Sequence, residues 1–169
     1  MARYAGGKSL EILTLGLDDE IFAIDAGVVR EILDVGTITR VPSAPAFVGG
    51  LINVRGKVVP LADLRLKFGM DLRPPTLDTR IVVIEIDFDG DPTTVGILAD
   101  KVYEVTEVAA AEQEETPRIG MRWRPQFIRC VGKRANDFII VLDIGRVFES
   151  DEPAWIAGGE PRPVGALVH

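Results

Sequence analysis

The residue types that carry out most enzyme chemistry are scarce in this sequence. The only histidine is His169 and the only cysteine is Cys130. Nucleophilic catalysis of the Ser–His or Cys–His type needs a base beside the nucleophile. None of the serines, Ser9, Ser43 and Ser150, lies in a Gly-x-Ser-x-Gly turn. Metal sites built from Cys and His are excluded by the same scarcity, so we expect no enzyme activity, no catalytic residue, no metal and no cofactor.

Two short motifs resemble ligand-binding loops only in part. Residues 5–9 (AGGKS) lack the first glycine and the preceding strand of a phosphate-binding P-loop. Residues 85–90 (EIDFDG) have the opening spacing of an EF-hand, but the twelfth position is Gly96 rather than a glutamate. A hairpin turn explains this stretch, and a small hydrolase or ligand-binding barrel that uses Glu85, Asp87 or Asp89 remains an alternative.

The charge of the chain argues against nucleic acid as a partner. The net charge is −7, whereas phosphate binding draws on Lys and Arg. Residues 118–129 (RIGMRWRPQFIR) are basic and aromatic, but residues 104–115 (EVTEVAAAEQEE) just before them are acidic. Opposite charges this close in the sequence favour ion pairs within one loop over nucleic-acid binding.

Composition indicates a globular chain in a reducing compartment. The 169 residues include 47% hydrophobic and 27% charged residues, which is typical of one folded domain. No apolar run reaches the ~18–20 residues that span a bilayer, so we expect a cytoplasmic protein with no direct membrane insertion. Cys130 cannot form an internal disulfide and is expected to be a small buried apolar side chain.

An arginine lies at the centre of the most apolar stretch. Residues 50–69 (GLINVRGKVVPLADLRLKFG) place Arg55, Gly56 and Lys57 between two apolar runs, a pattern that predicts a hairpin with Arg55 at its turn. In one interpretation Arg55 is an exposed turn residue whose ion pair is worth ~0–1 kcal/mol. In the other it is a recognition residue.

Short runs of β-branched and apolar residues, separated by turn signals, predict strands over most of the chain. We expect about ten, over residues 10–17, 21–24, 31–39, 51–54, 57–61, 81–88, 93–98, 102–108, 127–131 and 138–142. Two short helices are expected over 63–68 and 143–148, each with an aspartate at the N-cap.

The chain also repeats itself in order. Residues 22–32 (FAIDAGVVREI) align with residues 95–105 (VGILADKVYEV). Residues 58–68 (VVPLADLRLKF) then align with residues 138–148 (FIIVLDIGRVF) after a small insertion. Two related halves of about five strands each follow from these alignments.

We therefore expect an all-β fold. Five short antiparallel strands can close into a small barrel, which removes exposed sheet edges. Two five-stranded barrels, packed together with short helices, would share an apolar layer and leave a groove between them. The expected organisation is an N-terminal arm over 1–9, one domain over 10–149 with halves of roughly 10–75 and 76–149, and a flexible tail over 150–169.

Residues 41–69 carry a resemblance to a known family. They combine Pro-x-x-Pro-x-Phe, a glycine, an Asn-x-Arg-Gly hairpin turn and Pro-x-x-Asp-Leu-Arg in order. This combination resembles the signature of the CheW family, the adaptor proteins of bacterial chemosensory arrays. The similarity continues through residues 22–32, 94–105 and 138–148, so that it covers about residues 10–149.

The resemblance implies two barrels of the SH3-like (Src-homology-3-like) kind and a non-enzymatic adaptor function. Such an adaptor couples the cytoplasmic tip of chemoreceptors, the methyl-accepting chemotaxis proteins, to the regulatory domain of the histidine kinase CheA. It would lie in the cytoplasm at the inner face of the membrane, held there through receptor arrays. A CheW-like adaptor of a pilus-motility or other chemosensory pathway is an alternative, and so is a detached copy of the kinase's own regulatory domain.

The resemblance also implies a receptor-binding surface. Its positions in this sequence are Val29, Glu31, Ile32, Arg55, Ile81 and Val105. An arginine supported by a nearby glutamate presents several donors in one orientation, and a rim of Val and Ile provides a dry groove for an amphipathic receptor helix.

Overall fold

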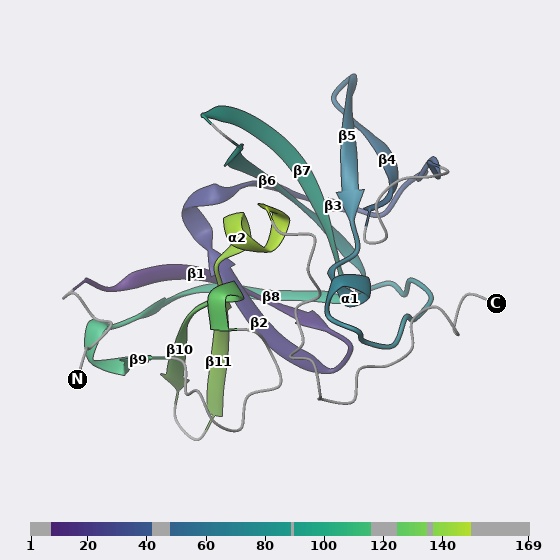
Figure 1. Ribbon diagram of the computed structural model, residues 1–169. Helices are drawn as coiled ribbons and strands as arrows, with labels where there is room; N and C mark the ends of the chain where they lie inside the picture. Colours follow the sequence, from purple (N-terminus) through teal and green to yellow (C-terminus); the bar gives the residue numbers. More distant parts are fainter. Residues whose placement is uncertain (1–7, 42–47, 89, 116–124, 135–136, 150–169) are drawn as a thin grey trace.

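The structure, a computed structural model, describes residues 8–41, 48–88, 90–115, 125–134 and 137–149. Within these ranges the chain forms eleven β-strands in two sheets, together with two short α-helices and three 3-10 helices (Figure 1). Both sheets curl into barrels. The predicted all-β fold of two barrels with short helices is therefore confirmed, whereas the predicted arm over 1–9 and tail over 150–169 lie almost wholly outside the described residues.

The first sheet has six strands in the order β8-β1-β2-β11-β10-β9. Its members are β1 (Leu10–Leu17), β2 (Glu20–Asp25), β8 (Lys101–Val108), β9 (Gln113–Glu114), β10 (Ile128–Arg134) and β11 (Asp137–Leu142). All neighbours are antiparallel except β2 and β11, which are parallel. The two residues of β9 were not predicted, because so short a strand leaves no periodic pattern.

The second sheet has five strands in the order β3-β6-β7-β5-β4. Its members are β3 (Val29–Asp34), β4 (Val48–Val54), β5 (Lys57–Ala62), β6 (Arg80–Phe88) and β7 (Asp91–Ala99). Thr39 and Leu51 exchange backbone hydrogen bonds of 2.9 and 2.7 Å, which join the chain after β3 to β4. The strand predicted over 31–39 is thus interrupted, because its first part pairs with β6 and its last residue pairs with β4.

The two α-helices begin as the sequence predicted. α1 (Leu64–Lys67) follows β5, and the carboxylate of Asp63 accepts a hydrogen bond of 3.1 Å from the backbone N–H of Arg65. α2 (Ile144–Glu149) follows β11, with Asp143 accepting from the backbone N–H of Arg146. Single 3-10 turns, η1 (Ala26–Val28), η2 (Ala110–Glu112) and η3 (Pro125–Phe127), connect other strands.

Strand pairing reproduces the internal repeat. Ala23 of β2 aligns in sequence with Gly96 of β7, and Val141 of β11 aligns with Leu61 of β5. In the structure Val141 pairs with Ala23, and Leu61 pairs with Gly96, both in parallel ladders. β5 and β11 also share one order of exposed and buried positions. The two barrels are therefore built on the same plan.

The sheets divide the chain differently from the repeat. The five-stranded sheet consists of the consecutive strands β3 to β7. The six-stranded sheet combines β1 and β2 with β8 to β11, from the two sides of that segment. Each of the predicted halves, 10–75 and 76–149, consequently contributes strands to both sheets.

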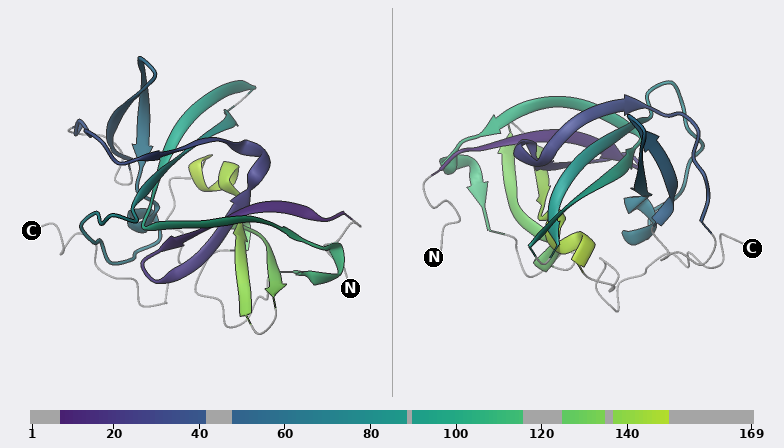
Figure 2. Two further views of the ribbon diagram at one scale, coloured as in Figure 1. Left: turned by 180° about the vertical axis from the view of Figure 1, so that it is seen from behind. Right: turned by 90° about the horizontal axis from the view of Figure 1, so that it is seen from above.

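A shared apolar layer holds the barrels together. One core cluster contains Leu15 and Phe22 from the first sheet, Val82 and Ile97 from the second, and side chains of both helices. The ring of Phe22 lies 5.6 Å from that of Phe68, centroid to centroid. Figure 2 shows the two sheets from behind and from above, with α2 near the place where they meet. None of the helices in the described ranges has the length and apolar character needed to cross a membrane.

Candidate functional site

The turn between β4 and β5 presents Arg55 at the tip of a hairpin. The two loop residues, Arg55 and Gly56, have φ angles of 54° and 85°, and a two-residue turn with both φ values positive matches the twist of the flanking strands. The side-chain oxygen of Asn53 accepts a hydrogen bond of 2.8 Å from the backbone N–H of Gly56. The asparagine and glycine of the Asn-x-Arg-Gly motif therefore stabilise the turn. The side chain of its arginine is 80% exposed.

Arg55 is paired with Glu31, a second residue of the receptor-binding surface that the resemblance implies. Its Nη2 lies 3.1 Å from Oε1 of Glu31, which is on β3. An exposed ion pair of this kind contributes ~0–1 kcal/mol to stability, so its main effect is to hold the guanidinium in one direction. On the same strand, Nε of Arg30 lies 3.2 Å from Oε1 of Glu85 on β6. The carboxylates of Glu31 and Glu85 are therefore both in ion pairs, with Arg55 and Arg30.

Gly50 lets β4 lie close to the segment after β3. A Cβ atom at this position would lie 2.5 Å from the carbonyl oxygen of Thr39 and 2.8 Å from a methyl carbon of Ile38. Only a residue without a side chain lets β4 approach the segment after β3 this closely. Gly50 thus permits the pairing of Thr39 with Leu51, which joins the chain after β3 to β4.

The other predicted binding residues differ in position. Val29 is partly buried against the shared core, and Ile32 is exposed on β3. Ile81 lies on β6, where it pairs with Leu33 of β3. It is only 2% exposed and lies in the core of its own barrel. Val105 is exposed but belongs to β8 in the other sheet, where it pairs with Leu13. The structure therefore unites Arg55 and Glu31, keeps Ile32 on the same strand as Glu31, and gives Ile81 a supporting place beneath the surface.

A buried ion network at the barrel junction was missed by the sequence analysis. Arg65 is buried and donates two hydrogen bonds to the carboxylate of Asp63, of 2.9 and 2.8 Å. It also donates to Oδ1 of Asp100, at 3.0 Å, in the connection between β7 and β8. The hydrogen bonds to Asp63 raise the pKa of the guanidinium. The available signal was the Asp-Leu-Arg end of the sequence motif, whose two charged residues pair with each other.

The same network reaches the first barrel. The other oxygen of Asp100 accepts a hydrogen bond of 2.7 Å from the backbone N–H of Asp18, in the β1–β2 turn. Arg73 contacts the carboxylates of Asp18 and Asp19 at 2.8 and 2.6 Å. Hydrogen bonding to Arg73 lowers the pKa of Asp19. These contacts connect the segment after α1, and the β7–β8 connection, to the β1–β2 turn of the six-stranded barrel.

The remaining candidates for chemistry have structural partners. Cys130 is buried, and its burial raises the pKa of the thiol. Arg129 approaches Asp25 of β2 at 3.4 Å rather than the acidic segment that precedes it in sequence. Residues 116–124 of the basic stretch lie outside the described residues, and so does Asp89. Among the described residues no group of three or more His, Cys, Asp or Glu side chains is placed to hold a metal ion.

Comparison with known proteins gives a consistent family assignment. The family model for the CheW-like domain matches residues 11–152. The chemotaxis protein CheW of Klebsiella aerogenes is 31% identical over 150 residues, which cover 89% of this chain and 87% of that protein. The crystal structure of the scaffolding protein TtCheW from Thermoanaerobacter tengcongensis superimposes with a TM-score of 0.72 at 28% identity, and covers 83% of this chain and 93% of that one.

A further relative matches a shorter part of the chain. Protein PilI of Pseudomonas aeruginosa is 31% identical over 83 residues, which cover 48% of this chain and 44% of that protein. It is therefore similar over about half of each chain, whereas the matches to CheW proteins extend over most of it.

Proposed function

This chain belongs to the family of CheW-like domains, and on that premise we propose that it is a non-enzymatic adaptor of chemotaxis. In this proposal it couples the cytoplasmic tip of chemoreceptors to the regulatory domain of the histidine kinase CheA. The protein would act in the cytoplasm, at the inner face of the membrane where receptor arrays assemble.

The observation that carries the proposal is the Arg55–Glu31 pair on an exposed hairpin tip. A guanidinium held by one carboxylate still has donors left for a partner. The exposed Ile32 follows Glu31 on β3 and adds apolar surface on the other face of that strand. An amphipathic helix with a carboxylate or carbonyl opposite Arg55 would satisfy both features. We propose that Arg55, Glu31 and Ile32 form the directly contacting part of the receptor surface, with Val29, Ile81 and Val105 as flanking or supporting residues.

Binding measurements with two separate partners test this function. Purified wild-type protein and Arg55→Ala are titrated with a receptor cytoplasmic fragment and, separately, with the CheA regulatory domain. We expect wild type to bind both at micromolar concentration, and Arg55→Ala to weaken receptor binding about tenfold or more, as for a central interface arginine. Kinase binding should stay within about twofold, because the fold does not depend on an exposed ion pair.

Arg146→Ala is a matched control. Arg146 is also an exposed arginine in an ion pair, with Asp143 at 3.4 Å, but it lies on α2. It should leave receptor binding unchanged. Failure of the wild-type protein to bind either partner would refute the adaptor function, whereas equal effects of the two arginine variants would refute only the role of Arg55.

The partial similarity to PilI supports a second candidate, an adaptor of a pilus-motility pathway. The same fold and surface would serve a different receptor and kinase. Co-purification of the tagged protein from its native cells, followed by identification of the bound receptor and kinase, separates the two pathways.

A further inference from the structure

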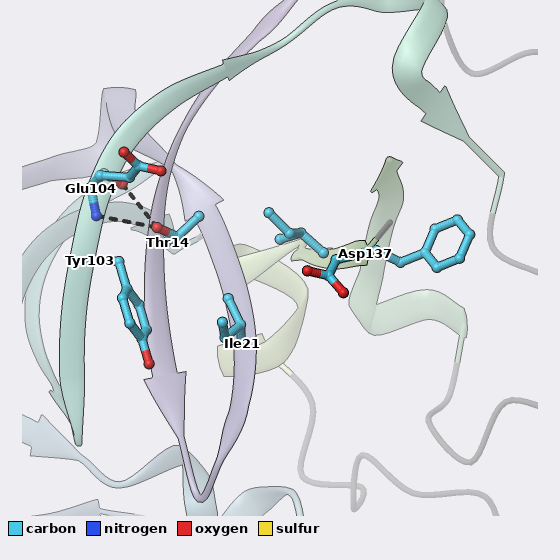
Figure 3. Close-up of a pocket in the computed structure, with 7 residues that line it drawn as sticks. Thr14, Ile21, Tyr103, Glu104 and Asp137 are labelled. Atoms are coloured by element: carbon cyan, nitrogen blue, oxygen red, sulfur yellow. Dashed lines mark hydrogen bonds between the residues drawn. The ribbon is translucent and has the colours of Figure 1, made fainter. Parts of the chain in front are cut away.

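A cavity of about 560 Å³ lies on the barrel that does not carry Arg55. It opens over β8, β1, β2 and β11, and Figure 3 shows side chains from these strands around it. Its volume falls within the roughly 300–1,000 Å³ that is usual for ligand-sized clefts. At its floor the hydroxyl of Thr14 joins β1 to β8, because it donates to the carbonyl oxygen of Glu104 at 3.1 Å and accepts from its N–H at 3.2 Å.

Large apolar side chains surround this cavity and remain exposed. Phe138 on β11 is 66% exposed, and Ile21 on β2 and Tyr103 on β8 are also exposed. Single exposed apolar residues are ordinary on protein surfaces. Three such residues from three strands around one cavity form a patch, and apolar patches of this kind mark interaction sites.

The charged groups that line the cavity are acidic. Glu104 and Asp137 contribute carboxylates, and none of its lining residues is a lysine or arginine. Two lysines lie nearby: Lys101 stacks over the ring of Tyr103 at 5.2 Å, and Lys133 lies 3.6 Å from Glu114. In a chain with a net charge of −7, this face favours a basic partner.

The internal repeat shows that this cavity is the counterpart of the Arg55 surface. Phe138 and Asp137 begin β11 as Val58 and Lys57 begin β5, and Glu104 aligns with Glu31. At the position equivalent to Arg55 the sequence has Ala135. The first surface therefore carries a carboxylate paired with a cationic donor, Arg55, whereas the second carries the carboxylates of Glu104 and Asp137 and larger apolar side chains.

We propose that the cavity bounded by Ile21, Tyr103, Glu104, Asp137 and Phe138 is a second docking surface, which binds a basic amphipathic helix of a partner protein. Apolar side chains on one face of that helix enter the cavity, and lysine or arginine side chains beside them approach Glu104 and Asp137. The proposal does not depend on the receptor function assigned to Arg55, because Arg55 and Glu31 lie on the five-stranded sheet, whereas the cavity lies on the six-stranded sheet.

The test uses a labelled synthetic peptide and the full chain. The probe is a peptide of leucine and lysine, about 15 residues or four turns long, with leucines on one face. Fluorescence anisotropy gives its affinity for wild type, Phe138→Ser and Asp137→Lys. The matched control is Val58→Ser, because Val58 is the repeat counterpart of Phe138 and is 70% exposed.

We expect wild type to bind the peptide, and both cavity variants to weaken binding at least tenfold. Val58→Ser should match wild type within about twofold. A peptide of the same composition with leucines spread around the helix, and one with glutamate in place of lysine, should bind at least tenfold more weakly. Circular dichroism and urea midpoints confirm that each variant is folded.

Three outcomes would overturn the proposal. The first is equal binding of the ordered and scrambled peptides, which indicates charge attraction alone. The second is an equal loss in Val58→Ser and Phe138→Ser. The third is a Phe138→Ser variant that loses CheA regulatory-domain or receptor binding, since the cavity would then belong to the function already proposed.

Discussion

Substitution of Gly50 by alanine should open the barrel that carries Arg55. The new Cβ would lie 2.5 Å from the carbonyl oxygen of Thr39, which accepts the backbone hydrogen bond from Leu51. That oxygen is part of the backbone, so the clash cannot be relieved by a side-chain rotation. The φ angle of Gly50 is also 153°, a value that L-residues rarely adopt.

The cost follows from these two effects. Two hydrogen bonds join Thr39 and Leu51, and each contributes about 0.5–1.5 kcal/mol to stability. Placing alanine in an unfavourable backbone region adds about 1–3 kcal/mol. We expect the free energy of unfolding to fall by about 2–6 kcal/mol in total.

Urea unfolding measures this loss, and amide hydrogen exchange at Leu51 and Thr39 locates it. Gly49→Ala is the control, because a Cβ there would meet its nearest atom, the carbonyl oxygen of Leu61, at an ordinary 3.7 Å. Gly49→Ala should cost less than about 1 kcal/mol. The explanation of barrel closure is refuted if Gly50→Ala is as stable as wild type, or if the two variants lose stability equally.

Three further perturbations test other parts of the structure. Arg65→Met leaves buried carboxylates without their cation and should cost about 3–5 kcal/mol in urea unfolding, whereas Arg146→Met on the surface should cost about 0–1 kcal/mol. Burial raises the pKa of the Cys130 thiol, so a thiol reagent should modify it at pH 8 only as fast as the protein opens; modification of the native protein at the rate of a free thiol would contradict its burial. The pKa of Asp19 is lowered from 3.8 by Arg73, so the stability from this pair is present above that pH and is lost as the pH falls through the lower folded value. Arg73→Gln should accordingly flatten the acid limb of the stability curve, and an unchanged limb would show that the pair does not form in solution.

Much of the fold was predictable because local patterns agreed with the final arrangement. The strand at residues 10–17 was predicted with the bounds it has in the structure, and both helices begin beside the predicted aspartates. The repeat predicted two similar barrels. It did not predict which strands pair, because β5–β7 and β2–β11 join segments that are far apart in sequence. Only tertiary packing decides such pairings.

The site was predictable to a smaller extent. Arg55 and Glu31, which the resemblance assigns to one surface, form an ion pair in the structure, and their role in binding stays a prediction. The turn that presents Arg55 depends on two positive φ angles and on an asparagine that accepts a hydrogen bond from Gly56. In the sequence this turn is visible only as the Asn-x-Arg-Gly motif. The cavity beside Phe138 was not predicted at all. Its residues come from four strands, and no single stretch of the sequence contains enough of them to form a pattern.

The repeat finally explains how one small chain could hold two different partners. Two copies of one barrel provide two surfaces built on the same strand plan, so the strand plan alone would not distinguish their occupants. Charge does so: Arg55 and Lys57 on one copy correspond to Ala135 and Asp137 on the other. A basic helix would meet the cations Arg55 and Lys57 at the first surface, where like charge disfavours it. Discrimination therefore comes from repulsion at the wrong surface as much as from attraction at the right one.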